Sequence, residues 1–138
     1  MSWKDKMQEF GGGDLAFLSE DGEVIKFIVV GEPALLTGRY KGKPSDKIGC
    51  PVVTEDGFQL LVTGKRLARK LSKYEGKFDD TAFMAIRHGV QGDIETSYEL
   101  KILDDVELTL RLLEIKERDF KADMIEQAVE DAASIMGK

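Results

Sequence analysis

The chain has 138 residues, of which 42% are hydrophobic and 33% charged, and its formal net charge is −6 at pH 7. This composition is typical of one folded domain with a real core, and it excludes a disordered chain. No apolar run approaches the ~18 residues of a membrane span. The first residues lack the apolar core of a secretory signal, and a single cysteine excludes an internal disulfide, so we expect a cytoplasmic protein.

Short runs of β-branched and aromatic residues, separated by turn residues, predict strands along most of the chain. Before them, the glycines at 11–13 are typical of a flexible joint, and we expect residues 1–19 to form a flexible head. Asp21–Gly22 predicts a turn, and Asp56–Gly57 predicts a hairpin or bulge. The first predicted strand segments, with a Gly/Pro loop after the second, lie at 23–30, 34–41, 51–54 and 58–63.

The pattern then changes to a helical period over residues 64–75. Leu67 and Leu71 recur at the i, i+4 spacing of one helix face. Thr63 is predicted to cap the start of this helix, and Gly76 is predicted to end it. The cations fall on the opposite arc, and they are Lys65, Arg66, Arg69, Lys70 and Lys73.

The last third of the chain predicts two strands and then two helices. The strands are expected at 79–89 and 92–103. Residues 106–116 alternate like a strand but have helix-favouring types, so we predict a helix there. Because residues 103–138 carry ten acids and five cations, we expect 104–138 to form an acidic helical extension. The final helix, at about 121–136, has an apolar stripe of Ile125, Ala128, Val129, Ala132 and Met136.

The order of these elements predicts the fold class. Strand, strand, strand, helix, strand, strand is the order of the OB-fold, a five-stranded, partly open Greek-key barrel. We therefore predict a mainly β protein with α, in which an OB-like five-stranded Greek-key barrel over residues 20–103 is followed by C-terminal helices. A split antiparallel sheet with packed helices gives a similar string of elements and is the alternative.

In residues 79–103, the strand that holds Phe83 ends in Arg87 and a glycine loop, and the next strand carries Thr96 and Tyr98. This segment resembles the last two strands of phage-type single-stranded-DNA-binding proteins. In that family a strand ends in a basic residue and a glycine loop, and the next strand carries Thr-x-Tyr. The matching residues are Phe83, Arg87, Gly89, Gly92, Thr96 and Tyr98. Residues 22–42 resemble the family's first hairpin. The resemblance implies an OB-fold that binds single-stranded DNA in replication or recombination, in the host cytoplasm, with an acidic C-terminal region that contacts partner proteins.

The residues themselves give a separate indication of nucleic-acid binding. A protein that binds single strands without sequence preference needs cations along the phosphates and aromatic rings on which bases stack. The segment Arg39-Tyr40-Lys41 has a ring between two cations. The candidate nucleic-acid-binding residues are Arg39, Tyr40, Lys41, Lys43, Lys47, Lys65, Arg66, Arg69, Arg87, Tyr98 and Lys101.

Each of these signals has a structural alternative. Tyr40 and Tyr98 lie in predicted strands, where tyrosines also serve as core residues with a satisfied hydroxyl. His88 beside a glycine is typical of a solvated turn, and Cys50 of a small buried hydrophobe. With one thiol and one imidazole in the chain, no Cys/His zinc site can form, and we expect no metal or other cofactor.

The basic helix has three interpretations. It lines the DNA path, or it is an ordinary amphipathic helix with a solvated cationic face, or it binds the protein's own acidic tail, residues 104–131. Single histidine and cysteine residues offer few nucleophile–base pairs, so we do not expect an enzyme. The alternative to DNA binding is a viral structural or assembly protein that uses an OB-like barrel and oligomerising helices. A homo-oligomer fits both.

Overall fold

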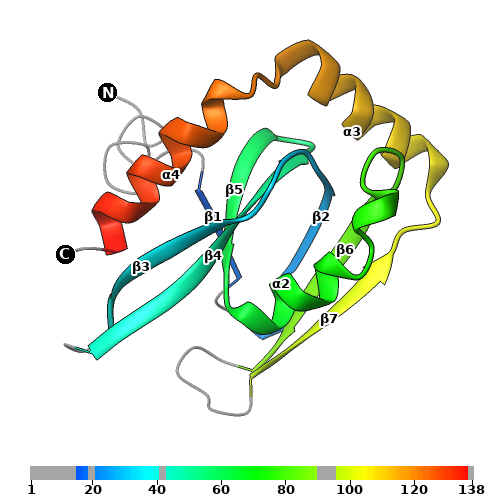
Figure 1. The fold of residues 1–138 in the computed structure, drawn as a ribbon. Coiled ribbons are helices and arrows are strands. Elements are labelled where there is room, and N and C mark those ends of the chain that lie inside the picture. Colours follow the sequence, from blue (N-terminus) through cyan, green and yellow to red (C-terminus); the bar gives the residue numbers. More distant parts are fainter. Residues whose placement is uncertain (1–14, 19–20, 41–42, 90–95, 137–138) are drawn as a thin grey trace, which may run out of the picture.

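The computed structural model describes residues 15–18, 21–40, 43–89 and 96–136, and it is shown in Figure 1. The described residues form one seven-stranded sheet with helices packed on it. The strands are β1 (Leu15–Phe17), β2 (Val24–Val29), β3 (Ala34–Tyr40), β4 (Lys43–Thr54), β5 (Gly57–Thr63), β6 (Phe83–His88) and β7 (Ser97–Ile102). The helices are α2 (Lys65–Ser72), the 3₁₀ turn η1 (Glu75–Lys77), α3 (Val106–Asp119) and α4 (Asp123–Met136).

The sheet has the order β1-β5-β4-β2-β6-β7, and β3 also pairs with β4. The long strand β4 pairs with two strands, β3 and then β2, along one of its edges. Residues 43–49 pair with β3, and Val52 and Val53 pair with β2. The change of partner falls at Pro51, whose carbonyl accepts a 2.9 Å hydrogen bond from the Val30 amide. The chain from β2 to β3 therefore continues along one edge of β4.

The predicted fold class is confirmed in its coarse form: the protein is mainly β with α. Every described strand pair within residues 20–103 is antiparallel. The predicted OB-like five-stranded barrel is not confirmed, because in the described residues β5 has β1 as its second neighbour and β7 ends the sheet order. β1 lies parallel to β5, so residues 15–17, which the sequence assigned to the flexible head, belong to the sheet.

Three local predictions are wrong. Residues 43–50 were expected to be largely loop, but they are the first part of β4 and pair with β3 and β5. Thr63 does not cap α2: the cap position is Gly64, and the Thr63 hydroxyl is buried without a partner among the described residues. The helix ends at Ser72 and not at Gly76. The helix predicted over 106–116 is confirmed as part of α3.

The side chains on the two faces of the sheet form two separate core clusters. Neighbouring residues such as Phe27 and Ile28 point to different clusters, as strand alternation requires. The cluster under α3 and α4 contains Ile28, Leu36, Phe58, Leu60, Leu108, Leu112, Ile115, Ala128 and Ala132. The cluster under α2 contains Phe27, Cys50, Val52, Leu61, Leu67, Leu71, Phe83 and Ala85. The acidic helices and the basic helix therefore pack on different parts of the core. Of the stripe of α4, Ala128 and Ala132 are buried, and Ile125 and Val129 are half-buried, on the side that faces β3 and β5.

Candidate nucleic-acid interface

A surface groove of about 520 Å³ brings together five of the candidate residues. It lies between the start of α2, the first half of β4 and the hairpin of β6 and β7. Its lining consists of Asp46, Lys47, Gly64, Lys65, Arg66, Arg87, Thr96 and Tyr98. Candidates from four separate elements therefore meet at one place, which the linear sequence alone does not show.

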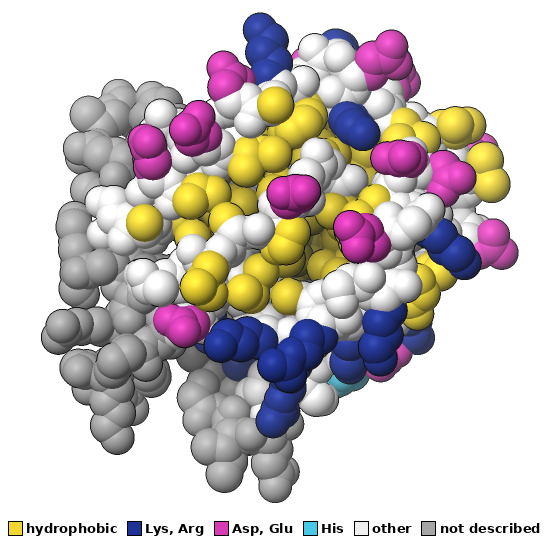
Figure 2. All heavy atoms as spheres, in the orientation of Figure 1, with side chains coloured by type: hydrophobic (Ala, Val, Ile, Leu, Met, Phe, Trp, Pro, Cys, Tyr) yellow, Lys and Arg dark blue, Asp and Glu magenta, His cyan; other side chains and the backbone are white. Residues whose placement is uncertain are grey.

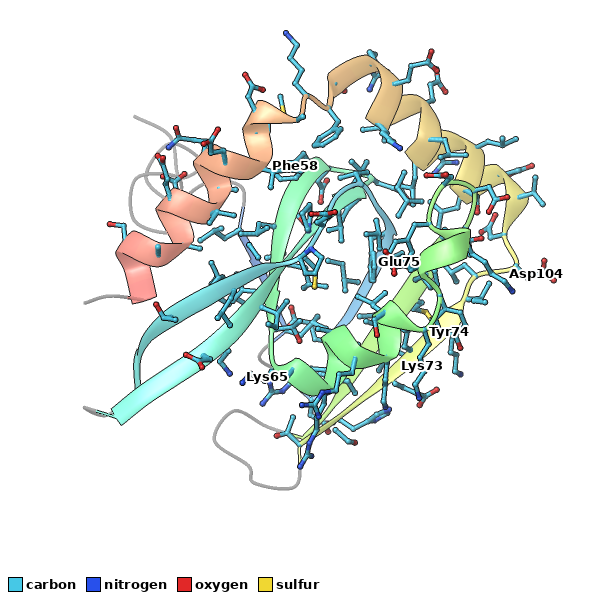
Figure 3. All side chains as sticks on the ribbon, viewed as in Figure 1. Phe58, Lys65, Lys73, Tyr74, Glu75 and Asp104 are labelled. Carbon is cyan, nitrogen blue, oxygen red and sulfur yellow. The ribbon has the colours of Figure 1, made fainter. Side chains whose placement is uncertain are left out.

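The helix α2 supplies the cations at one side of the groove because of how it is buried. Leu67 and Leu71 are fixed in the core under the helix with Ala68 half-buried beside them, so the opposite face of the helix is turned to solvent. The four cations of its eight residues are exposed, and no acid lies in its first turn. Figure 2 shows Lys and Arg side chains gathered along one edge of the face in view. Figure 3 labels Lys65 at the start of α2 and Lys73 just after its end.

Arg87 has a structural role at the floor of the groove. It is only 8% exposed. Its Nη1 donates to the Leu18 carbonyl at 2.8 Å and to the Tyr98 hydroxyl at 3.0 Å, and its Nε donates to the Gly89 carbonyl at 2.8 Å. A buried cation with this many acceptors is held by the fold. Arg87 therefore orients Tyr98 and joins the two hairpin strands, and it is not an exposed phosphate contact.

Tyr98 combines the two roles that the sequence left open. Its ring is half-buried and packs against the cluster under α2, and it also lines the groove. The Arg87 guanidinium carbon lies 5.8 Å from the ring centroid. Because Arg87 donates to the hydroxyl, the polar end of the ring is already satisfied. Tyr98 is thus a rigid aromatic wall of the groove.

Lys101 is not part of the groove lining. Its ammonium lies 2.9 Å from Glu99 on the same strand, and His88 lies 3.0 Å from the other oxygen of that carboxylate. Hydrogen bonds from Lys101 and then His88 hold the pKa of Glu99 below its ordinary value. Arg87 lies opposite Tyr98 in the sheet, and Lys101 is three residues further along β7, so Lys101 belongs to the other face of the sheet. Its place in the interface stays a prediction.

Several candidates lie at the edge of what the structure describes. Lys41 is outside the described residues. The backbones of Arg39, Tyr40 and Lys43 belong to β3 and β4, where Tyr40 is paired with Lys43, but their side chains are not described. Their place in the interface stays a prediction. Arg69 is exposed on α2 beyond the groove lining.

The groove is cationic but not purely so. Asp46 lines it and lies 3.9 Å from the Lys65 ammonium, with both side chains about half exposed. An exposed pair at this distance contributes little to stability and leaves the lysine able to exchange partners. Asp46 and Gly64 carried no sequence signal for this site, whereas Thr96 belonged to the Thr-x-Tyr motif.

The acidic helices do not neutralise this surface. Among the described residues, the ion pairs of α3 are Arg111 with Glu55 at 3.2 Å and Arg118 with Asp119 at 2.9 Å, and none joins α3 or α4 to α2. Figure 2 shows acidic side chains over the part of the face that α3 and α4 occupy, away from the cationic edge. Docking of the tail on the basic helix within one chain is therefore not observed.

A second, more apolar groove of about 590 Å³ lies between α2 and the β2–β3 connection. Its floor includes Val30, Pro51 and Leu71, and Figure 2 shows it as a hydrophobic hollow with acidic side chains at its rim. Cys50 also lines it, and burial raises the pKa of this thiol to about 11. At neutral pH the thiol is therefore protonated and a poor nucleophile, as expected of a small core residue.

Comparisons of the chain with family models, curated proteins and solved structures found no match. Within the described residues, no group of three or more His, Cys, Asp or Glu side chains is arranged to hold a metal ion. No described helix is long and apolar enough to cross a membrane. The groove is therefore the feature of the molecule that points to a function.

Proposed function

We propose that this protein binds single-stranded DNA without sequence preference, in phage replication or recombination in the host cytoplasm. The observation that carries the proposal is the groove, in which exposed Lys47, Lys65 and Arg66 lie beside the fixed ring of Tyr98. Cations neutralise the phosphates, and an aromatic wall gives bases a surface to stack on. In this proposal the acidic helices α3 and α4 contact partner proteins of replication or recombination.

The strand pairing supports the same proposal. β2 and β3 together act as a first strand, followed by β4, β5, α2, β6 and β7, and the pairs β2–β4, β4–β5, β2–β6 and β6–β7 are antiparallel. This order fits an OB-like barrel that is left open beside β5. OB-folds bind oligonucleotides on the face of their second and third strands and through the adjoining loops. Lys47 of the second strand and Thr96 before the fifth line the groove here.

The test is a titration of fluorescently labelled oligo-dT, followed by anisotropy at several salt concentrations. For the wild type we expect binding that weakens steeply with salt, and weaker binding to duplex DNA of the same length. Lys47→Ala and Arg66→Ala should each reduce the slope of log K against log salt by roughly 0.7, the value of one single-strand phosphate contact. Lys121→Ala, an exposed cation between α3 and α4, is the matched control and should leave the slope unchanged.

A variant of Tyr40 gives a separate test in the same titration. Tyr40→Ala should weaken binding by about 1–3 kcal/mol, the contribution of one stacked base, with little change in the salt slope. If the wild type fails to bind oligo-dT at about 50 mM salt, where phosphate contacts are strongest, the proposal is wrong. If Lys121→Ala changes the slope as much as Arg66→Ala, the groove is not the site.

The second candidate is a viral structural or assembly protein. It is favoured by an exposed apolar patch formed by Ile102, Val106 and Leu110, which lies outside the lining of the groove. A protein that assembles but does not bind oligo-dT would fit this candidate.

A further inference from the structure

One edge of strand β7 is paired with no other strand among the described residues. Among the described residues it pairs only with β6, and it is the last strand in the sheet order. The Leu103 amide donates to the Ala82 carbonyl at 2.9 Å. This hydrogen bond determines which residues of β7 direct their backbone N–H and C=O groups toward β6. By the antiparallel alternation, the N–H and C=O groups of Tyr98, Leu100 and Ile102 therefore point outward. Lys70 of α2 donates to the Tyr98 carbonyl at 2.5 Å, as this orientation requires.

Exposed apolar side chains continue from the end of this edge. Ile102 is 42% exposed, Val106 69% and Leu110 60%. With Leu103 and Leu113 they line a depression of about 350 Å³ where β7 leads into α3. An open strand edge beside an apolar patch is a surface that proteins usually cover, by pairing or by charge.

We propose that a second copy of this chain covers it, with the two β7 strands antiparallel about a two-fold axis at Leu100. Three features argue for this occupant. First, the outward residues then hydrogen-bond to one another, with Leu100 opposite Leu100 and Tyr98 opposite Ile102. Second, each apolar patch begins at Ile102, so it then lies beside Tyr98 of the second copy, once at each end of the paired strands. The same two contacts occur twice, as a two-fold interface requires.

The third feature is the charge pattern, which selects the register. Glu99 and Lys101 lie on one face of β7. About an axis at Leu100, each Glu99 faces Lys101 of the second copy in a non-hydrogen-bonded pair, where side chains are closest. Sliding the strands by two residues in either direction places Glu99 against Glu99 or Lys101 against Lys101. Only the central register pairs opposite charges on both sides.

The pairing also changes the contact between α2 and β7. The Tyr98 carbonyl has to accept from the Ile102 amide of the second copy, so Lys70 has to release it. Lys70 and the second copy therefore compete for the same carbonyl, and Lys70→Ala should strengthen the dimer.

The experiment is sedimentation velocity on the full chain from about 1 to about 200 μM, a range that detects micromolar dimers. We expect a concentration-dependent dimer for the wild type. Lys101→Glu and Glu99→Lys each create like-charge pairs in the central register, and each should weaken the dimer by roughly tenfold or more. The double variant with both substitutions restores opposite charges and should dimerise again.

A mixture of the two single variants gives a stricter test. The Lys101→Glu variant carries acids at both positions 99 and 101, and the Glu99→Lys variant carries lysines at both. They should form a mixed dimer more readily than either forms its own. Leu110→Asp should also weaken the dimer, whereas Leu35→Asp, an equally exposed leucine on β3, is the matched control. Circular dichroism checks that each variant is folded.

A wild type that stays monomeric over this range overturns the proposal. So does a dimer that neither single charge substitution weakens, or one that the double variant does not restore. Binding of oligo-dT is measured separately on each variant, and because the dimer proposal does not depend on DNA binding, either proposal can fail alone.

Discussion

The basic helix α2 and the acidic helices α3 and α4 follow the same packing rule with opposite charges. α2 is held by Leu67 and Leu71 and exposes four cations. α3 is held by Leu108, Leu112 and Ile115 and exposes most of its acids. In each case apolar burial fixes the orientation of the helix, and the charges are left outside.

The contrast between the cationic surface of α2 and the acidic surface of α3 and α4 shows which charges are available to a ligand. Exposed ion pairs contribute little to folding, so neither surface needs its charges to keep its helix in place. The two surfaces also do not neutralise each other, because no ion pair joins them among the described residues. The segregated charges that the sequence displays are therefore free to set what each side of the molecule attracts.

The largest effects are expected where the packing of the two sides is broken. Leu67→Ala and Leu112→Ala each remove a fully buried leucine, and each should lower the free energy of unfolding by about 2–5 kcal/mol. Denaturant unfolding measures this loss. Oligo-dT affinity, measured where both variants are folded, should fall for Leu67→Ala only, because only that change loosens α2. Equal affinities for the two variants would contradict the assignment of DNA binding to the α2 side.

A smaller effect separates local charge from net charge. Reversing two cations of α2, in Arg66→Glu with Arg69→Glu, should weaken oligo-dT binding by about 2–4 kcal/mol at low salt, because two attractions become repulsions at ~1 kcal/mol each. The matched variant, Glu126→Lys with Glu130→Lys, makes the same size of charge change on α4. It should alter affinity little. Changes of similar size and opposite sign in the two variants would mean that net charge, and not the α2 surface, decides binding.

The two sides also differ in how far the sequence predicts them. The period of Leu67 and Leu71 predicted α2, and the Asp56–Gly57 pair predicted the turn between β4 and β5, where Gly57 has a φ of +103° that glycine adopts easily. Residues 43–50 were misassigned because Pro44 and Gly49 disfavour strands locally. The pairing of residues 43–49 with β3, joined from Ile48 onward by pairing with β5, overrides that preference.

The sequence predicted several residues of the groove, but it did not predict that they lie together. Lys47, Lys65, Arg66 and Tyr98 were candidates because of their types, and they meet only through the sheet topology. Arg87 was a candidate because it is a cation that matches the resemblance, just before the glycine loop. One of its actual partners, the Leu18 carbonyl, lies 69 residues away, and no local pattern reveals such a contact.

The smallest expected effect compares the starts of the two helices. Asp105 caps α3, since its carboxylate accepts from the Leu108 amide at 3.0 Å, whereas α2 begins at Gly64 with no side-chain cap. Asp105→Ala should therefore cost about 0.5–2 kcal/mol of stability. Gly64 has an extended backbone, and a β-carbon added at this position would meet no atom within 4 Å, so Gly64→Asp should instead add a few tenths of a kcal/mol.

The same substitution at Gly64 also puts a carboxylate into the groove. It should weaken oligo-dT binding by about 1 kcal/mol, the scale of one added repulsion near 4 Å in water. Gly64→Ser is the matched control, because it supplies a cap without a charge and should leave affinity unchanged. Thermal unfolding checks the predicted change in stability, and the oligo-dT titration checks the predicted change in affinity. A Gly64→Asp variant that gains stability and binds as the wild type does would remove the start of α2 from the proposed DNA path.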